Sequence, residues 1–266
     1  MPLFSHESIK IFYHDQGSGL PLVLLSGLGG DHQSVWQPCF DELAKKHRII
    51  AVDNRNCGKS QFVEESFTIK DMANDLKSLL DHLNINKCDV VGYSLGGFIA
   101  QQFALEYPEA VNRLILACSY SRMSNHLYLY MEAVRIAYEK SRSLQTVFDL
   151  VYPFLFRRAY YEESPTGRET IILPQEELQE PFYGWLRQYE AQRAFDSRAW
   201  LNKIKQPTLV IGGTEDLLVP MEELEFLCKE IPNAKLIAIK NAGHMVSFEQ
   251  TSEFTKSILQ FLSDRL

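Results

Sequence analysis

CDVVGYSLGGFIAQQFALEY, at residues 88–107, contains a predicted strand, a tight turn and a helix in direct succession. The apolar residues of 88–94 are typical of a strand buried on both faces of a parallel sheet. The helix follows at 95–107, and Gly92 and Gly96 flank Ser94 at the junction. Small residues at these two places allow a strained turn that holds the Ser94 hydroxyl above the sheet.

The same alternation of strand and helix extends along most of the chain. A helix is predicted to begin at Thr68, with Thr68 as its N-cap and Asp71 near its positive end. Further helices are predicted at residues 35–46, 220–230 and 247–262, and further strands at 9–15, 22–25, 48–53, 111–118, 207–213 and 234–240. This order predicts an α/β fold, with a mostly parallel central sheet and helices on both faces.

The alternation of strands and helices is interrupted at residues 120–200. They contain no buried-strand run, but they hold 16 of the 31 aromatic residues. We therefore expect a helical cap insertion at 120–200 and an α/β core formed by residues 1–119 and 201–266. An insertion at the carboxyl edge of a parallel sheet lies where such folds bind ligands, and its aromatic side chains predict an apolar pocket.

Composition excludes several classes of protein. The net charge of −7 argues against nucleic acid as a partner, because binding to phosphate needs a basic surface. No apolar stretch is long enough for a membrane span, and MPLFSHESIK does not resemble a secretory signal. The five cysteines are scattered and show no metal-ligand spacing, which predicts reduced thiols, a cytoplasmic protein and no metal site.

Ser94 needs a base before its hydroxyl becomes a nucleophile. Of seven histidines, His244 is the candidate, because it lies between the last predicted strand and the last helix, at the same sheet edge as Ser94. A carboxylate should then orient the imidazole. Asp216 follows the predicted strand that ends at Gly213, and spacing alone leaves its neighbour Glu215 as an alternative.

Five short motifs carry a resemblance that covers essentially the whole chain: SGLGG at 26–30, D-x-R-x-x-G-x-S at 53–60, GYSLGG at 92–97, D-x-x-V-P at 216–220 and GH at 243–244. With these motifs the sequence resembles the α/β-hydrolase superfamily. The most similar branches are serine esterases, enol-lactonase-like proteins and pimeloyl-carrier-protein methyl ester esterases. The resemblance favours Asp216 over Glu215, because Asp216 begins the shared D-x-x-V-P segment.

The resemblance also implies further site residues. The backbone N–H groups of Leu28 and Leu95 would form an oxyanion hole, and Gly27 and Phe248 would contact the substrate. Two positions depart from many relatives, because Ser26 stands in place of a histidine and Asn56 in place of a glycine. Asn tolerates a positive φ, so we expect the turn at Asn56 to survive. Arg55, in the same turn, is expected to be structural.

These residues predict a carboxylic-ester hydrolase of the serine type. Ser94, His244 and Asp216 would cleave a small-to-medium ester, thioester or lactone through an acyl-enzyme, with no metal or organic cofactor. Two alternatives remain: a C–C bond hydrolase with the same triad, and a receptor of the same fold that binds its ligand without turnover.

An acyl carrier protein is the one macromolecular partner that the sequence suggests. Nine arginines and eleven acidic residues lie in residues 120–200. The simplest interpretation is a solvated surface held by ion pairs. The alternative is that Arg157 and Arg158 face an acidic carrier or a substrate carboxylate, since the planar guanidinium binds such groups in two places.

Overall fold

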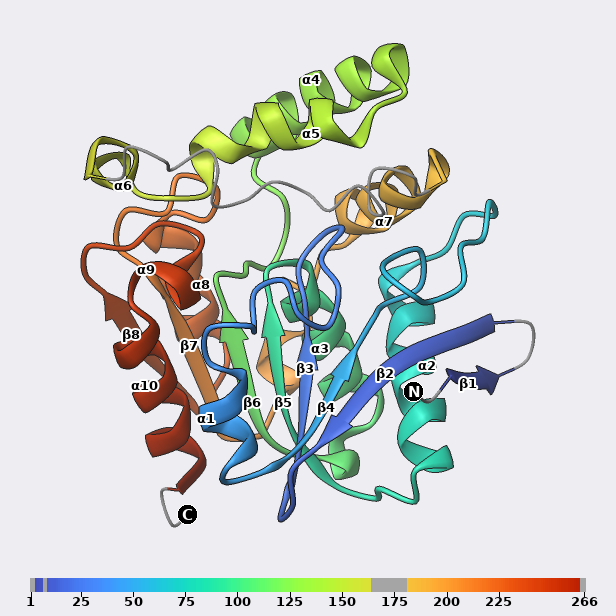
Figure 1. The fold of residues 1–266 in the computed structure, drawn as a ribbon. Helices are drawn as coiled ribbons and strands as arrows, with labels where there is room; N and C mark the ends of the chain where they lie inside the picture. Colours follow the sequence, from blue (N-terminus) through green and yellow to red (C-terminus); the bar gives the residue numbers. More distant parts are fainter. Residues whose placement is uncertain (1–2, 7–8, 164–180, 264–266) are drawn as a thin grey trace.

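The computed structural model describes residues 3–6, 9–163 and 181–263. Its centre is one eight-stranded sheet in the order β1-β2-β4-β3-β5-β6-β7-β8 (Figure 1). The strands are β1 (Leu3–His6), β2 (Ile9–Gln16), β3 (Pro21–Leu25), β4 (Arg48–Val52), β5 (Cys88–Tyr93), β6 (Val111–Ala117), β7 (Thr208–Gly213) and β8 (Ala234–Ile239). All neighbours from β4 to β8 pair in parallel, while β1 with β2 and β2 with β4 are antiparallel. The predicted fold class is confirmed.

Helices cover both faces because the central strands are apolar on both faces. In β3, Val23 and Leu25 join one hydrophobic cluster and Leu22 and Leu24 join the other. The first cluster includes residues of α2 (Ile69–His82), α3 (Leu95–Glu106) and α8 (Met221–Glu230), and the second includes residues of α1 (Phe40–Ala44), α9 (Val246–Glu249) and α10 (Thr251–Ser263). Successive side chains of a strand point to opposite faces, so one short run supplies two cores.

The start of α2 follows the prediction. The Thr68 side chain accepts a hydrogen bond from the Asp71 N–H at 3.2 Å, and an Asp71 carboxylate oxygen accepts the Thr68 N–H at 2.7 Å. This reciprocal capping box satisfies two N–H groups that the first helical turn leaves unpaired.

Two predicted helices and one strand differ from expectation. The helix predicted at 35–46 is reduced to α1, preceded by turns. Pro38 has no N–H and cannot donate the backbone hydrogen bond that a longer helix would need there. The helix predicted at 247–262 is divided into α9 and α10, because Gln250, with a φ of −133° and a ψ of 49°, lies outside the helical region. The strand β1 was not predicted.

In the described part of residues 120–200, four α-helices lie above the carboxyl ends of the parallel strands (Figure 1). They are α4 (Asn125–Ser141), α5 (Leu144–Val151), α6 (Arg158–Glu163) and α7 (Tyr183–Ala194). The two ends of the segment meet where Arg122 and Asp196 form an isolated antiparallel bridge and the Ser197 N–H donates to the Ser121 carbonyl at 3.0 Å. Residues 164–180, which include Arg168, lie outside the described residues.

Three single-turn 3-10 helices complete the described secondary structure: η1 (Pro108–Ala110), η2 (Tyr152–Phe154) and η5 (Leu201–Lys203). Among the described helices, none combines the length and the hydropathy that crossing a membrane requires.

Candidate active site

Ser94 occupies the sharp turn between β5 and α3. Its φ is 52° and its ψ is −115°, a left-handed conformation that costs a non-glycine residue about 1–3 kcal/mol. The turn needs glycine on both sides of Ser94: a Cβ on Gly92 would lie 2.2 Å from the Gly96 carbonyl oxygen, and a Cβ on Gly96 would lie 2.2 Å from the Leu25 carbonyl oxygen. The packing of the turn therefore explains the two glycines of the motif.

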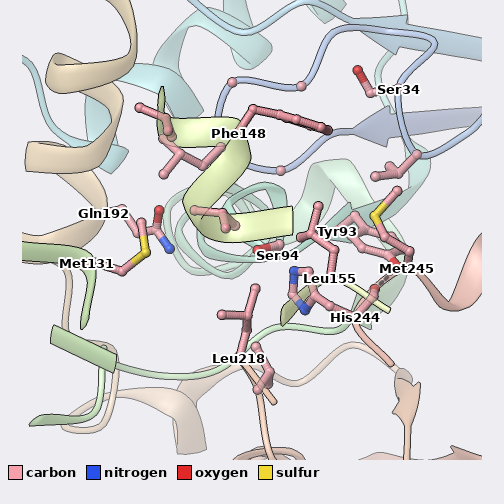
Figure 2. Close-up of a pocket in the computed structure, with 18 of the residues that line it drawn as sticks. Ser34, Tyr93, Ser94, Met131, Phe148, Leu155, Gln192, Leu218, His244 and Met245 are labelled. Carbon is pink, nitrogen blue, oxygen red and sulfur yellow. Dashed lines mark hydrogen bonds between the residues drawn. The ribbon is translucent and has the colours of Figure 1, made fainter. Parts of the chain in front are cut away.

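Hydrogen bonds hold this strained turn. The Ser94 N–H donates to the Ala117 carbonyl at 2.9 Å, which ties the turn to β6. The Ser94 carbonyl accepts the Gly97 N–H and the Ser119 hydroxyl, each at 2.9 Å. With the Ser94 backbone anchored in this way, its side chain lies among the cavity-lining residues drawn in Figure 2.

His244 and Asp216 form a buried pair, and His244 lines the same cavity as Ser94. The His244 Nδ1 lies 2.7 Å from the Asp216 Oδ2, and both residues are 6% exposed. The other carboxylate oxygen of Asp216 accepts the N–H groups of Leu218 and Val219 at 2.8 and 2.9 Å. A carboxylate only accepts hydrogen bonds, so the Nδ1 carries the proton and the Nε2 is left as the basic nitrogen. Glu215 is exposed, and its neighbour Asp216 makes the contact.

The His244 loop, residues 240–245 between β8 and α9, is held by hydrogen bonds to Tyr93 of β5 and to Leu155. The buried Tyr93 hydroxyl donates to the His244 carbonyl, and the Met245 N–H donates to the Leu155 carbonyl at 2.8 Å. Burial raises the pKa of Tyr93 well above its usual value, so the hydroxyl keeps the proton that it donates. Sequence reasoning missed this role of Tyr93, although the residue lies next to Ser94 in the motif.

The glycine loop, residues 26–31, passes over Ser94. A Cβ on Gly27 would lie 3.3 Å from the Ser94 Cβ, so only a glycine lets the backbone come this close without displacement. The Ser26 hydroxyl donates to the Asp31 carbonyl at 2.6 Å and closes the loop, which explains how serine serves where many relatives have histidine.

Leu28 and Leu95, the predicted oxyanion residues, occupy suitable elements. Leu28 lies in the glycine loop and lines the cavity above Ser94, and Leu95 is the first residue of α3. The hydrogen bonds of the described residues include none donated by either N–H. A helix N-terminus carries unpaired N–H groups and a partial positive charge, so the Leu95 N–H can receive a developing negative charge.

A cavity of about 360 Å³ contains both Ser94 and His244 (Figure 2). Gly27 and Phe248, the two predicted substrate contacts, line it. Helices α4, α5 and α7 supply much of its apolar wall, including Met131, Phe148 and Trp185. Among the described residues, no Asp, Glu, Lys or Arg lines the cavity. Such a wall favours an uncharged ligand, because a buried charge without a partner is strongly disfavoured.

The turn at residues 53–60 is structural, as the sequence predicts. The Arg55 guanidinium binds the Asp75 carboxylate in two places, at 2.6 and 2.7 Å, and lies 5.1 Å from the centre of the Phe67 ring. Asn56 adopts a φ of 62°, and its side chain forms hydrogen bonds of 2.7 and 2.8 Å with the Val63 backbone. Asn56 therefore adopts the positive φ that the turn requires, as predicted.

Among the residues that the structure describes, two groups of side chains have a composition that could suit a metal ion: Cys118, Asp216 and His244, and Asp31, His32 and Asp53. In the first group, the Asp216 carboxylate already accepts three hydrogen bonds. Burial also raises the pKa of the Cys118 thiol, which disfavours the thiolate that metals bind. In the second, Asp53 accepts hydrogen bonds from the His32 ring, the His32 N–H and the Lys59 N–H. Hydrogen bonding within the protein thus accounts for both groups.

Arg157 and Arg158, the predicted contacts for an acidic partner, both have partners within the chain. Arg157 forms an ion pair with Glu163, and its Nε lies 3.6 Å from the Glu249 carboxylate. Arg158, with a side chain that is 89% exposed, pairs with Glu162 at 3.3 Å. These contacts favour the interpretation of a surface held by ion pairs.

Comparison with known proteins agrees with this architecture. The family model described as "alpha/beta hydrolase fold" matches residues 21–163 and 178–251. A protein of Stutzerimonas stutzeri (strain A1501), named "Putative carbamate hydrolase RutD", is 30% identical over 255 residues, which cover 92% of each chain.

Solved structures show the same likeness. A thermophilic esterase from Thermogutta terrifontis is 30% identical, with a TM-score of 0.85, over 96% of this chain and 93% of the other. The enol-lactonase from Burkholderia xenovorans LB400 is 25% identical, with a TM-score of 0.88, over 99% of this chain and all of the other. Since the family model matches well over half of the residues, the chain belongs to the alpha/beta hydrolase family.

Proposed function

We propose that the protein is a serine hydrolase that cleaves a neutral carboxylic ester, thioester or lactone. The observation that supports this most strongly is the 2.7 Å contact between His244 and Asp216 at the wall of the cavity that also contains the strained Ser94. A nucleophile, a base and an orienting carboxylate at one site are the parts that acyl transfer needs.

In the proposed reaction, the His244 Nε2 takes the proton from the Ser94 hydroxyl as its oxygen attacks the substrate carbonyl carbon. Asp216 stabilises the imidazolium that forms. The N–H groups of Leu28 and Leu95 donate to the oxyanion of the tetrahedral intermediate, and one such donor is typically worth about 3 kcal/mol. His244 then protonates the leaving group, and an acyl-enzyme remains on Ser94.

The second half of the reaction repeats these steps with water. His244 accepts a proton from a water molecule, the resulting oxygen attacks the acyl-enzyme carbonyl, and Ser94 leaves with the proton returned by His244. Each step is a proton transfer or an attack on a carbonyl, so neither half requires a metal ion or an organic cofactor.

The cavity supports a neutral, largely apolar substrate. Its wall is mostly aliphatic and aromatic, and its ionisable groups are His244 and the tyrosines Tyr93 and Tyr120. A substrate carboxylate would find no arginine or lysine there among the described residues. The likeness to an esterase and to an enol-lactonase is compatible with this, and the carbamate hydrolase name of the curated relatives refers to a carbonyl compound as well.

Residues 120–200 are proposed to act as a cap on a core formed by residues 1–119 and 201–266. Support comes from the position of α4 to α7 above the sheet (Figure 1) and from the side chains that α4, α5 and α7 contribute to the cavity wall. We further propose that the substrate is a free small molecule rather than one attached to an acyl carrier protein, because Arg157 and Arg158 are already paired.

Covalent labelling tests the proposed reaction. A fluorophosphonate should add its phosphonyl mass once to the wild-type protein and to Ser34→Ala, a cavity-lining control, but not to Ser94→Ala. Ser94→Ala should also abolish hydrolysis of a short p-nitrophenyl ester while its melting temperature stays close to that of the wild type. Full esterase activity in Ser94→Ala would refute the assignment.

A further inference from the structure

Residues 155–157, between η2 and α6, contact the His244 loop directly. The Met245 N–H donates to the Leu155 carbonyl at 2.8 Å. Gly243 packs so closely against the segment that a Cβ there would lie 2.6 Å from the Arg157 nitrogen. Residues 155–157 and the His244 loop are thus in backbone contact, although they are far apart in the sequence.

The Glu249 carboxylate connects the same two segments a second time. One oxygen accepts the Gly243 N–H at 2.7 Å, and the other accepts the Arg157 N–H at 3.1 Å. The side chain is only 1% exposed, and the Arg157 Nε lies 3.6 Å away. Each oxygen of the Glu249 carboxylate thus accepts one backbone N–H group. An ionised carboxylate suits this place because it offers two acceptor oxygens and no donor.

Both connected segments contribute to the cavity. Leu155 and His244 line it, and Figure 2 shows them close together at its wall, near Ser94. A displacement of residues 155–157 would therefore move the cavity wall and the loop that carries the proposed base. Misplacement of a catalytic group by about 1 Å can lower a rate about 100-fold.

We infer that Glu249 is a positioning residue, whose carboxylate holds the His244 loop against residues 155–157 and so sets the place of His244 relative to Ser94. This inference rests on the proposed function. Glu249 does not line the cavity, so it acts through the Gly243 and Arg157 backbone rather than on the substrate.

Charged and titratable groups around Glu249 bear on its ionisation. They are Arg157, Glu215, Tyr161 and Cys118. Burial raises the pKa of Glu249 above its usual value, and the two N–H donors and Arg157 oppose this effect. Protonation turns one acceptor oxygen into a hydroxyl and weakens one of the two connections, so mild acid should loosen the loop.

Substitutions of Glu249 test what its two acceptor oxygens contribute to the position of the His244 loop. Glu249→Gln keeps one acceptor but points an amide donor at an N–H group, so kcat for a p-nitrophenyl ester should fall about tenfold. Glu249→Leu keeps the approximate volume and loses both acceptors, so kcat should fall about 100-fold. The KM should change little in either variant, because the cavity-lining side chains are unchanged. Glu253→Gln, an exposed position on α10, is the matched control and should behave like the wild type.

The pH profile gives a readout that a purely structural role would not move. In the wild type, protonation of Glu249 should add to the loss of kcat in acid. In Glu249→Gln this contribution should be absent, so kcat should fall less steeply with acid than in the wild type.

The inference is overturned if Glu249→Leu keeps the wild-type kcat, or if kcat falls only in proportion to the unfolded fraction measured by circular dichroism. A different result identifies failure of the proposed function: the wild-type protein would then not be labelled by the fluorophosphonate at Ser94. Labelling of the wild type, together with slower labelling of folded Glu249→Leu, supports both.

Discussion

The Gln188 side chain accepts a hydrogen bond from the Gly29 N–H at 2.9 Å, across a sequence separation of 159 residues. Its amide nitrogen donates to the Arg55 carbonyl at 2.7 Å. One buried side chain of α7 thus joins the glycine loop above Ser94 to the structural turn at Arg55. Because Leu28 belongs to that glycine loop, α7 helps to place a proposed oxyanion donor.

Replacing Gln188 tests this connection. Gln188→Met has a similar volume but loses both hydrogen bonds, which should let the glycine loop move. We expect kcat for a short ester to fall about tenfold, with a smaller change in KM, because the donor is displaced rather than removed.

A remote glutamine provides the control for Gln188. Gln102→Met removes a surface hydrogen bond to Glu106 and should leave kcat within about twofold of the wild type. Wild-type kcat in a folded Gln188→Met variant would show that the glycine loop keeps its position without α7.

Replacing Asp216 and its neighbour Glu215 in turn by the corresponding amide tests which of them is the third triad member. Asp216→Asn replaces one acceptor oxygen of the pair with an amide, favours the wrong His244 tautomer and should lower kcat about 10⁴-fold. Glu215→Gln, at an exposed position one residue earlier, should leave kcat within about twofold. Steady-state hydrolysis of p-nitrophenyl acetate measures both, and the reverse ranking would disprove the assignment of Asp216.

The buried His47 predicts a dependence of stability on pH. Burial lowers the pKa of His47 below its usual value of 6.5, and the nearby Asp89 only partly opposes this. The unfolded chain therefore binds a proton more readily than the folded protein in the window just below pH 6.5. The free energy of unfolding should consequently decrease as the pH falls through that window.

His47→Gln should remove this contribution. Between pH 7.5 and pH 5.5, its urea midpoint should fall less than that of the wild type, while the exposed His126→Gln control should follow the wild type. Parallel curves for wild type and His47→Gln would mean that His47 titrates alike in the folded and unfolded chains.

Salt dependence tests whether a carrier protein is recognised. If the substrate is a free neutral ester, kcat/KM should be nearly constant between low and physiological salt, and Arg158→Glu should not change it. An ester linked to an acidic carrier protein should show no steep salt dependence either. A steep fall for the carrier-linked ester alone, reduced further by Arg158→Glu, would instead indicate electrostatic recognition of a carrier.

The sequence by itself determined the features that depend on neighbouring residues. The parallel sheet could be predicted because short apolar runs such as 88–93 have no other way to bury both faces. The turn at Ser94 could be predicted in part, because the contact that requires Gly92 arises within the turn, whereas Gly96 is required by the carbonyl of Leu25 in the neighbouring strand β3. The capping of α2 by Thr68 is local in the same way.

Only the tertiary structure decided which distant groups meet. Spacing left both Glu215 and Asp216 open, and the choice depends on which side chain the turn after β7 directs at His244. The contacts of Gln188 with Gly29, and of Glu249 with Gly243 and Arg157, leave no periodic signal. Such contacts arise when the upper helices pack on the sheet, and that packing is set by the sum of many weak apolar contacts rather than by any local pattern.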